Sequence, residues 1–112
     1  MQYMALIFHD ETPPENMDEI MQAYGELNQA MVAAGAFVAG DALQPSNTAT
    51  CVKVRDGKTQ VTDGPFAETK EQLGGYYLME CENLDHAVEW AARIPAAAGG
   101  TIEVRPVMVF DL

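Results

Sequence analysis

The sequence predicts an α+β fold with a ferredoxin-like βαββαβ plan, in which an antiparallel sheet carries two helices on one face. Three observations indicate this class. Strand-like apolar segments occur at both ends of the chain, two segments show helical spacing, and an Asp-Gly pair separates two short alternating stretches. Because 112 residues are close to the usual size of one domain, we expect residues 1–112 to form a single domain with an inserted β-hairpin.

The N-terminal third is predicted to contain a strand and the longest helix. Residues 2–9 have apolar side chains on both faces of the strand, and the prolines at positions 13 and 14 suit the first turn of a helix. Gly35 fits the left-handed position that commonly follows a helix end. The apolar stripe of this helix consists of Met17, Ile20, Met21, Tyr24, Leu27 and Met31.

The rest of the chain alternates strands with one further helix. The Asp-Gly pair at positions 56 and 57 favours a two-residue hairpin turn, which places Val52 opposite Val61. Asn83 is a candidate N-cap of the second helix. The predicted elements are strands at 36–43, 74–81 and 101–110, a hairpin at 50–62, and a helix at 83–95 with Ala87, Val88, Ala91 and Ile94 as its inner stripe.

Charge and cysteine usage exclude several functions. Six basic and 17 acidic residues give a formal net charge of −11, which repels phosphate backbones and anionic lipids, so neither direct nucleic-acid binding nor membrane binding is expected. Cys51 and Cys81 lack metal-ligand or redox spacing and suit a reduced cytoplasm. No two-His or His/Cys spacing and no Gly-rich phosphate loop occurs, so we predict neither metal nor cofactor.

The distribution of apolar residues predicts a homodimer. Two helices can cover only one face of the sheet, but the predicted strands carry large apolar side chains on both faces. A second copy of the chain is the simplest cover, because exposed apolar faces of this size are rare on monomers and two-fold dimers are the commonest oligomers. We therefore expect two subunits packed sheet to sheet.

The segment VTDGPFAETKEQLGGYYL, residues 61–78, is the predicted site. Pro65 restricts Gly64 before it, so the turn holds the Asp63 carboxylate at a strand end, where it can act as a base or cap nearby amides. Phe66 can anchor the loop or stack on a substrate. The next charged residues, Glu68, Lys70 and Glu71, either balance one another over a cleft or form a solvated cluster.

Two further groups are candidates outside this segment. His9 ends the first strand beside two acidic residues, Asp10 and Glu11, which favour its protonated form. Glu103 and Arg105 share one face of the last strand, where an ion pair is geometrically reasonable. That pair can hold a polar or anionic ligand in a dimer cleft, or it can be a structural pair at the subunit rim.

The stretch ATCVKVRDGKTQVTDGPFAETKEQLGGYYLMECENLDHAVEWAARIP, followed by IEVRPV, resembles the YCII-related family in its DGPF branch. The resemblance covers nearly the whole chain and implies a dimeric α/β barrel with a cleft between the subunits. It also implies a small-molecule lyase or dehydrochlorinase activity, or association with a sigma factor. YCII-like relatives carry a proposed catalytic His on the first helix, whereas this chain has Tyr24 and Glu26 in that region.

Two functional hypotheses follow. The first is a cofactor-independent lyase or isomerase with Asp63 as base, Glu71 or Glu68 as second carboxylate, and His9 as proton shuttle. Its substrate would be a small organic molecule, bound by Phe66, Glu68, Lys70, Glu103 and Arg105. The alternative is a non-catalytic protein that binds a metabolite or a regulatory partner such as a sigma factor.

Overall fold

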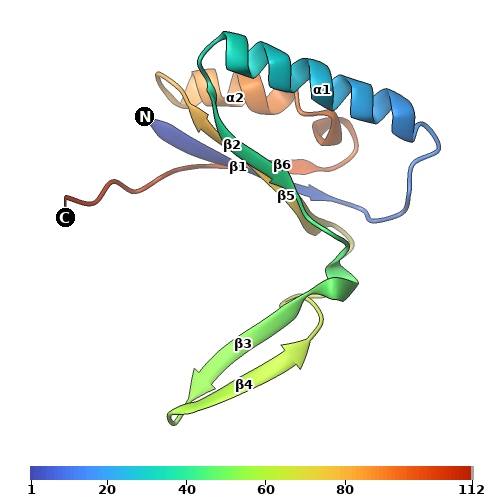
Figure 1. The fold of residues 1–112 in the computed structure, drawn as a ribbon, viewed down its shortest axis with the longest axis vertical. Helices are drawn as coiled ribbons and strands as arrows, with labels where there is room; N and C mark the ends of the chain where they lie inside the picture. Colours follow the sequence, from blue (N-terminus) through green and yellow to red (C-terminus); the bar gives the residue numbers. More distant parts are fainter. Residues whose placement is uncertain (112) are drawn as a thin grey trace.

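In the computed structural model, which describes residues 1–111, one antiparallel sheet supports two helices (Figure 1). The sheet has the strand order β2-β5-β1-β6, and both helices lie on the same face of it. The ferredoxin-like α+β prediction is therefore confirmed. The sheet and the two helices consist of β1 (Gln2–His9), α1 (Met17–Ala33), β2 (Phe37–Ala42), β5 (Gln72–Glu80), α2 (Leu84–Ala92) and β6 (Thr101–Pro106).

The core lies between the sheet and the helices. β1 and β5 each contribute alternate residues to it, among them Ala5 and Met79, which are fully buried. The Tyr77 hydroxyl donates a 2.6 Å hydrogen bond to Asn28 Oδ1 and so ties β5 to α1. The buried apolar residues are Tyr3, Ala5, Ile7, Leu27, Met31, Ala36, Tyr77, Met79, Cys81, Ala87, Trp90, Ala91 and Ile94.

Helix burial differs in part from the predicted stripes. The C-terminal half of α1 is buried at Leu27 and Met31, but Met17 and Met21 near its start are exposed. On α2, Val88 is exposed and Trp90 takes the buried position instead. Trp90 suits that position because its indole N–H donates a 3.2 Å hydrogen bond to Nε2 of His86 while the ring packs on the core.

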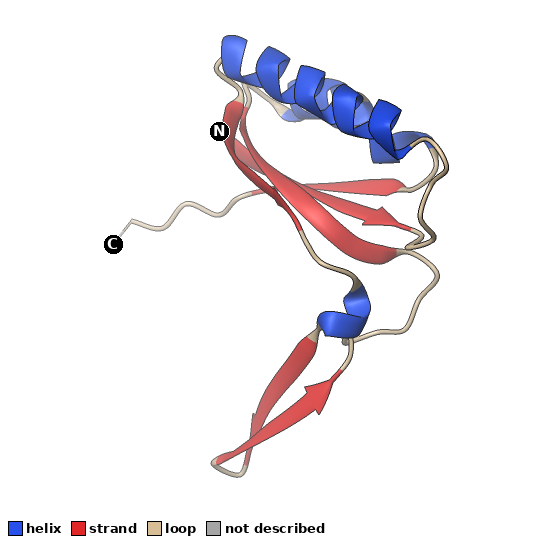
Figure 2. Ribbon diagram, turned by 45° about the vertical axis from the view of Figure 1, so that its right-hand side comes forward, coloured by secondary structure: helices blue, strands red, loops and turns tan. Residues whose placement is uncertain are grey.

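Between β2 and β5 the chain forms a separate hairpin arm, β3 (Thr50–Arg55) and β4 (Lys58–Asp63), preceded by the short helix η1 (Ser46–Thr48). The arm projects from the sheet on the side away from the helices (Figures 1 and 2). Positive φ angles of 52° at Asp56 and 73° at Gly57 are those of a type I′ turn, and Val52 pairs with Val61 as predicted.

The last strand is shorter than predicted. After the short helix η2 (Pro95–Ala98), β6 ends at Pro106 rather than at residue 110, because its neighbour β1 begins at Gln2 and offers no further partner. The Val107 amide still donates to the Gln2 carbonyl, and the chain then leaves the sheet with Phe110 exposed. Within residues 1–111, no helix is both long and apolar enough to cross a membrane.

The face of the sheet without helices carries a second set of large side chains. The strand register aligns Met4 with Leu78 and Leu6 with Tyr76 on this open face. These side chains are half-buried by their neighbours within the sheet. The Tyr76 hydroxyl donates a 2.8 Å hydrogen bond to Asp41 on β2, and this bond to the carboxylate raises the pKa of Tyr76. Apolar side chains therefore lie on both faces, but helices cover only one.

Substitution of two glycines should have opposite effects on stability. A methyl group on Gly100 would lie 2.3 Å from the Phe8 carbonyl oxygen and 3.0 Å from that of Ala96, so backbone must move. Gly100→Ala is expected to cost about 1–3 kcal/mol of unfolding free energy. Gly25 is exposed within α1 and has open space, so Gly25→Ala should add about 0.5–1 kcal/mol. Urea denaturation of both variants measures this, and equal effects would contradict the close approach at Gly100.

Candidate functional site

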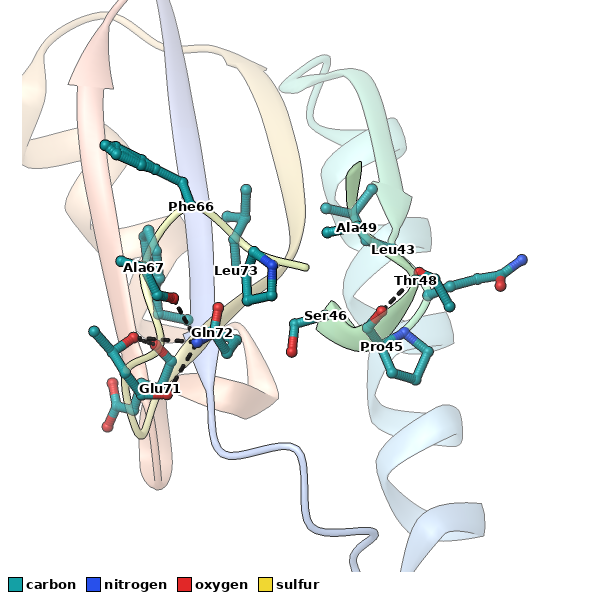
Figure 3. Close-up of a pocket in the computed structure, with 14 residues that line it drawn as sticks. Leu43, Pro45, Ser46, Thr48, Ala49, Phe66, Ala67, Glu71, Gln72 and Leu73 are labelled. Atoms are coloured by element: carbon teal, nitrogen blue, oxygen red, sulfur yellow. Dashed lines mark hydrogen bonds between the residues drawn. The ribbon is translucent and has the colours of Figure 1, made fainter. Parts of the chain in front are cut away.

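A cleft of about 590 Å³ lies where the arm joins the sheet (Figure 3). One wall is the 43–49 segment between β2 and β3, and the other is the 65–73 segment, which consists of the loop after β4 and the first two residues of β5. Phe8 at the end of β1 also lines the cleft. Most of the lining surface is apolar, from Phe8, Leu43, Pro45, Ala49, Pro65, Phe66, Ala67 and Leu73.

The 43–49 wall is held by the carboxylate of Glu11, from the loop after β1. Glu11 Oε2 accepts a 2.6 Å hydrogen bond from the Ser46 amide, and Oε1 accepts one from the Ser46 hydroxyl. These hydroxyl and amide bonds lower the pKa of Glu11. The Leu43 amide also donates a 2.8 Å bond to the Gly74 carbonyl. The wall is therefore tied to the loop after β1 and to β5.

The 65–73 wall is held mainly by bonds to its own backbone. The Gln72 side-chain amide donates to the Ala67 carbonyl at 2.9 Å and to the Thr69 carbonyl at 3.0 Å (Figure 3). The Thr69 hydroxyl donates a 2.6 Å bond to the Glu71 carbonyl. These contacts give the loop a defined shape although most of its side chains are exposed.

Gly64 joins this loop to the base of the arm. Its φ of 108° lies in a region that favours glycine. Its amide donates a 2.7 Å bond to the Ala49 carbonyl, and its own carbonyl accepts a 3.2 Å bond from the Cys51 thiol. The tight turn predicted around Gly64 is thus part of the structure that closes the hairpin at its base.

Two of the predicted site residues, Phe66 and Glu71, line the cleft. Phe66 is 82% exposed, and Figure 3 shows its ring and the Glu71 carboxylate directed away from the 43–49 wall, at the edge of the cleft. Glu68 and Lys70, from the same loop, are exposed and lie outside the lining. The structure therefore brings this part of the predicted segment to the cleft through its backbone and its apolar residues.

His9 lies next to the cleft but does not line it. Its Nδ1 is 2.8 Å from the Asp10 carbonyl, an acceptor, so Nδ1 carries the proton of that bond. The pairing of β1 with β5 skips Gly74, and the His9 ring lies over this bulge. A methyl group on Gly74 would be 2.1 Å from His9 Nε2, so the ring needs glycine there.

Asp10 follows His9 in the loop after β1. Its carboxylate accepts a 2.8 Å bond from the Thr12 amide. The pKa of Asp10 is lowered, first by hydrogen bonding to Thr12 and further by the positive charges of Lys70 and His9. The ion pairs among residues 1–111 with atoms closer than 4.0 Å include neither Asp10 nor Lys70.

The remaining predicted site residues lie elsewhere. Asp63 is exposed at the end of β4 opposite Thr50, and within residues 1–111 its carboxylate makes no hydrogen bond. Glu103 and Arg105 form the predicted ion pair, with 2.9 Å between Oε2 and Nε, on the open face of β6. Neither this pair nor Asp63 lines the cleft.

Sequence reasoning did not identify the 43–49 wall, Gln72 or Glu11 as parts of a site. The Pro45-Ser46-Asn47-Thr48 run is rich in turn-forming residues and indicates a loop. Nothing local in it indicates that Glu11, 35 positions earlier, would bind Ser46. A long-range contact of this kind depends on the order of strands in the sheet. β1 and β2 lie on the two sides of β5, so the segments that follow them lie at the same edge of the sheet.

The fold and the cleft define a ferredoxin-like α+β protein with an open, mostly apolar cleft at the base of a hairpin arm. Comparison over the whole chain then gives the family. The model of the YCII-related domain matches residues 1–111. A protein of Rhizobium meliloti (strain 1021) described as uncharacterized is 35% identical over 98% of this chain and 94% of its own length. This chain belongs to the YCII-related family, as its resemblance to that family predicted.

The Ser46 amide should report the ionisation of Glu11. Because hydrogen bonding in the folded state lowers the pKa of Glu11 below its ordinary 4.5, the contact stabilises the fold above that pH. It is lost as the pH falls through the lowered pKa. In an NMR titration the Ser46 amide resonance should stay constant near neutral pH and move with a midpoint below 4.5. Glu11→Ala should abolish this transition, and a midpoint above 4.5 would contradict the proposed contact.

Proposed function

We propose that this protein binds a small, largely apolar organic molecule in the cleft between the 43–49 and 65–73 segments. The observation that carries this proposal is the cleft itself. Its volume of about 590 Å³ lies within the roughly 300–1,000 Å³ typical of small-molecule sites, and its lining is mostly apolar with a few polar groups. Hydrogen bonds to Glu11 and Gln72 hold both walls in place, which lowers the ordering cost of binding.

Binding is the function that this geometry supports best. A cofactor-independent lyase or isomerase would need Asp63 or His9 within hydrogen-bond reach of the bound molecule. Of the predicted catalytic residues Asp63, His9 and Glu71, only Glu71 lines the cleft of the single chain. The acid-base mechanism and the sigma-factor association therefore stay predictions, and the binding proposal depends on neither.

A neutral aromatic alcohol provides a direct test of the cleft. Titration of the protein with 2-phenylethanol should give saturable NMR shifts at the amides of residues 43–49 and 65–73. Leu43 and Leu84 have nearly equal exposure, 49% and 51%, but only Leu43 lines the cleft. Leu43→Asp should weaken binding about tenfold, equivalent to about 1.4 kcal/mol, because it places a charge in an apolar wall.

The matched control for this experiment is Leu84→Asp, which adds the same charge at the start of α2. It should bind the alcohol as the unmodified protein does. Shifts that do not saturate, or equal weakening by both variants, would exclude this cleft as the binding site.

We also propose that the protein is a homodimer in which a second copy covers the open face of the sheet. Met4, Leu6 and Leu78 form an apolar centre on that face. The arm lies on the same side of the sheet (Figure 2) and has its own uncovered apolar face, with Val52 62% and Val61 63% exposed. A two-stranded hairpin is at best marginally stable in water without packing partners, which favours a partner for the arm as well.

The distribution of charge also favours a second copy of the chain as the partner of the arm. Three of the six basic residues, Lys53, Arg55 and Lys58, lie on the arm. Residues 50–63 contain three basic and two acidic side chains, so the arm has a net charge of +1 and the rest of the chain −12. The arm of one copy is therefore attracted electrostatically to the body of another.

Substitution of the arm valines should weaken the dimer. Val52→Thr combined with Val61→Thr keeps side-chain shape and strand propensity but adds buried hydroxyl groups at the interface. We expect at least a tenfold loss of dimer affinity, about 1.4 kcal/mol. Light scattering over a dilution series measures it, with the 12.2 kDa monomer as the lower limit.

The control substitution is Val88→Thr, at a similarly exposed valine on the helix layer, which should leave the dimer unchanged. A monomeric mass for the unmodified protein at high concentration would exclude the dimer. Equal weakening by the arm and control substitutions would exclude the arm from the interface.

A further inference from the structure

We infer that the cleft selects molecules that donate hydrogen bonds, namely protonated amines on an apolar body, and rejects carboxylates and other anions. This inference rests on the proposed binding function and names its ligand class. It follows from which polar side-chain atoms of the lining are already used within the protein and which remain for a ligand.

The hydroxyl protons of the lining are committed to other groups of the protein. The Ser46 hydroxyl donates to Glu11. The Thr48 hydroxyl donates a 2.7 Å bond to the Pro45 carbonyl, and the Thr69 hydroxyl donates a 2.6 Å bond to the Glu71 carbonyl. A hydroxyl has one proton and two lone pairs. Each of these groups can therefore offer a ligand only an acceptor.

The Gln72 side chain also offers a ligand an acceptor but no free donor. Its nitrogen donates to the carbonyls of Ala67 and Thr69, while its oxygen makes no hydrogen bond within residues 1–111. Gln44 is the one lining side chain of the described residues whose N–H donors are uncommitted, and it is neutral and exposed. The side chains of the cleft thus offer many acceptors and few donors.

The charge of the site favours the same ligand class. Glu71 is the only charged residue of the described lining, and no Lys, Arg or His contributes to it. The Glu11 carboxylate is hydrogen-bonded to Ser46 of the 43–49 wall, and the whole chain has a net charge of −11. An anionic ligand would lose hydration without gaining a cationic partner. An ammonium group at the edge of the cleft would meet the Glu71 carboxylate instead.

Three probes with the same phenyl ring and two-carbon chain test this inference: 2-phenylethylamine, 2-phenylethanol and 3-phenylpropanoate. Dissociation constants come from NMR titrations at pH 7 and 0.15 M salt, read at amides of the two cleft walls. We expect the amine to bind at least fivefold more tightly than the carboxylate, with the alcohol between them. Carboxylate binding equal to or tighter than amine binding would overturn the selectivity and leave the cleft as a site. No saturable binding of any probe would refute the binding function itself.

A pair of charge-matched variants separates the cleft from the general charge of the protein. Glu71→Gln and Glu89→Gln each remove one negative charge, but Glu89 is exposed on α2 and outside the cleft lining. Glu71→Gln should weaken amine binding at least threefold more than it weakens alcohol binding. Glu89→Gln should affect neither. Equal weakening of amine binding by both variants would mean that net charge alone attracts the amine, and would overturn the inference.

Discussion

The two helices cover one face of a sheet whose central strands carry large apolar side chains on both faces. On the covered face, Ala5 and Met79 are completely buried, whereas Leu6 and Leu78 on the open face are shielded only by neighbours within the sheet. The hairpin arm projects on the open side and cannot compensate, because it pairs only with itself. The open face and the exposed valines of the arm therefore lie on one side of the molecule, where no further layer of the described chain covers them.

The cleft and the arm are mechanically connected. The 43–49 and 64–71 segments are the two chain connections that carry the arm, and they also contribute most of the two walls of the cleft. Glu11 fixes one connection through Ser46, and Gln72 fixes the other. A partner that held the arm in place would also restrict the cleft walls, so the proposed association and the proposed ligand binding would act on the same two segments.

The strand and helix pattern was predictable because it depends on local signals. The Asp56-Gly57 pair fixes its turn through backbone angles that few other residues adopt, and the register of the arm follows from that turn. The face of α2 that packs against the sheet was less predictable. Ala87 and Ala91 fit a stripe that continues through either Val88 or Trp90, and only packing against the sheet, together with the Trp90–His86 hydrogen bond, selects Trp90.

The candidate site was predictable only in part, for a physical reason. The charged residues of the 63–71 segment are easy to recognise in a sequence. Hydrogen bonds made by backbone atoms cannot be recognised in this way, because most residue types can make them. Gly64 is required for its φ of 108°, and its amide and carbonyl close the base of the arm through Ala49 and Cys51. The turn therefore positions the arm and one cleft wall at once.

This arrangement gives the Asp63–Phe66 turn a role that does not depend on the charge of Asp63. A residue with a Cβ at position 64 would strain the backbone there, and the change would reach both the 65–73 wall and the arm. Removal of the Asp63 charge would leave the Gly64 backbone bonds intact. The shape of the site and any chemistry of its carboxylate are thus separable properties of neighbouring residues, and each can be altered without the other.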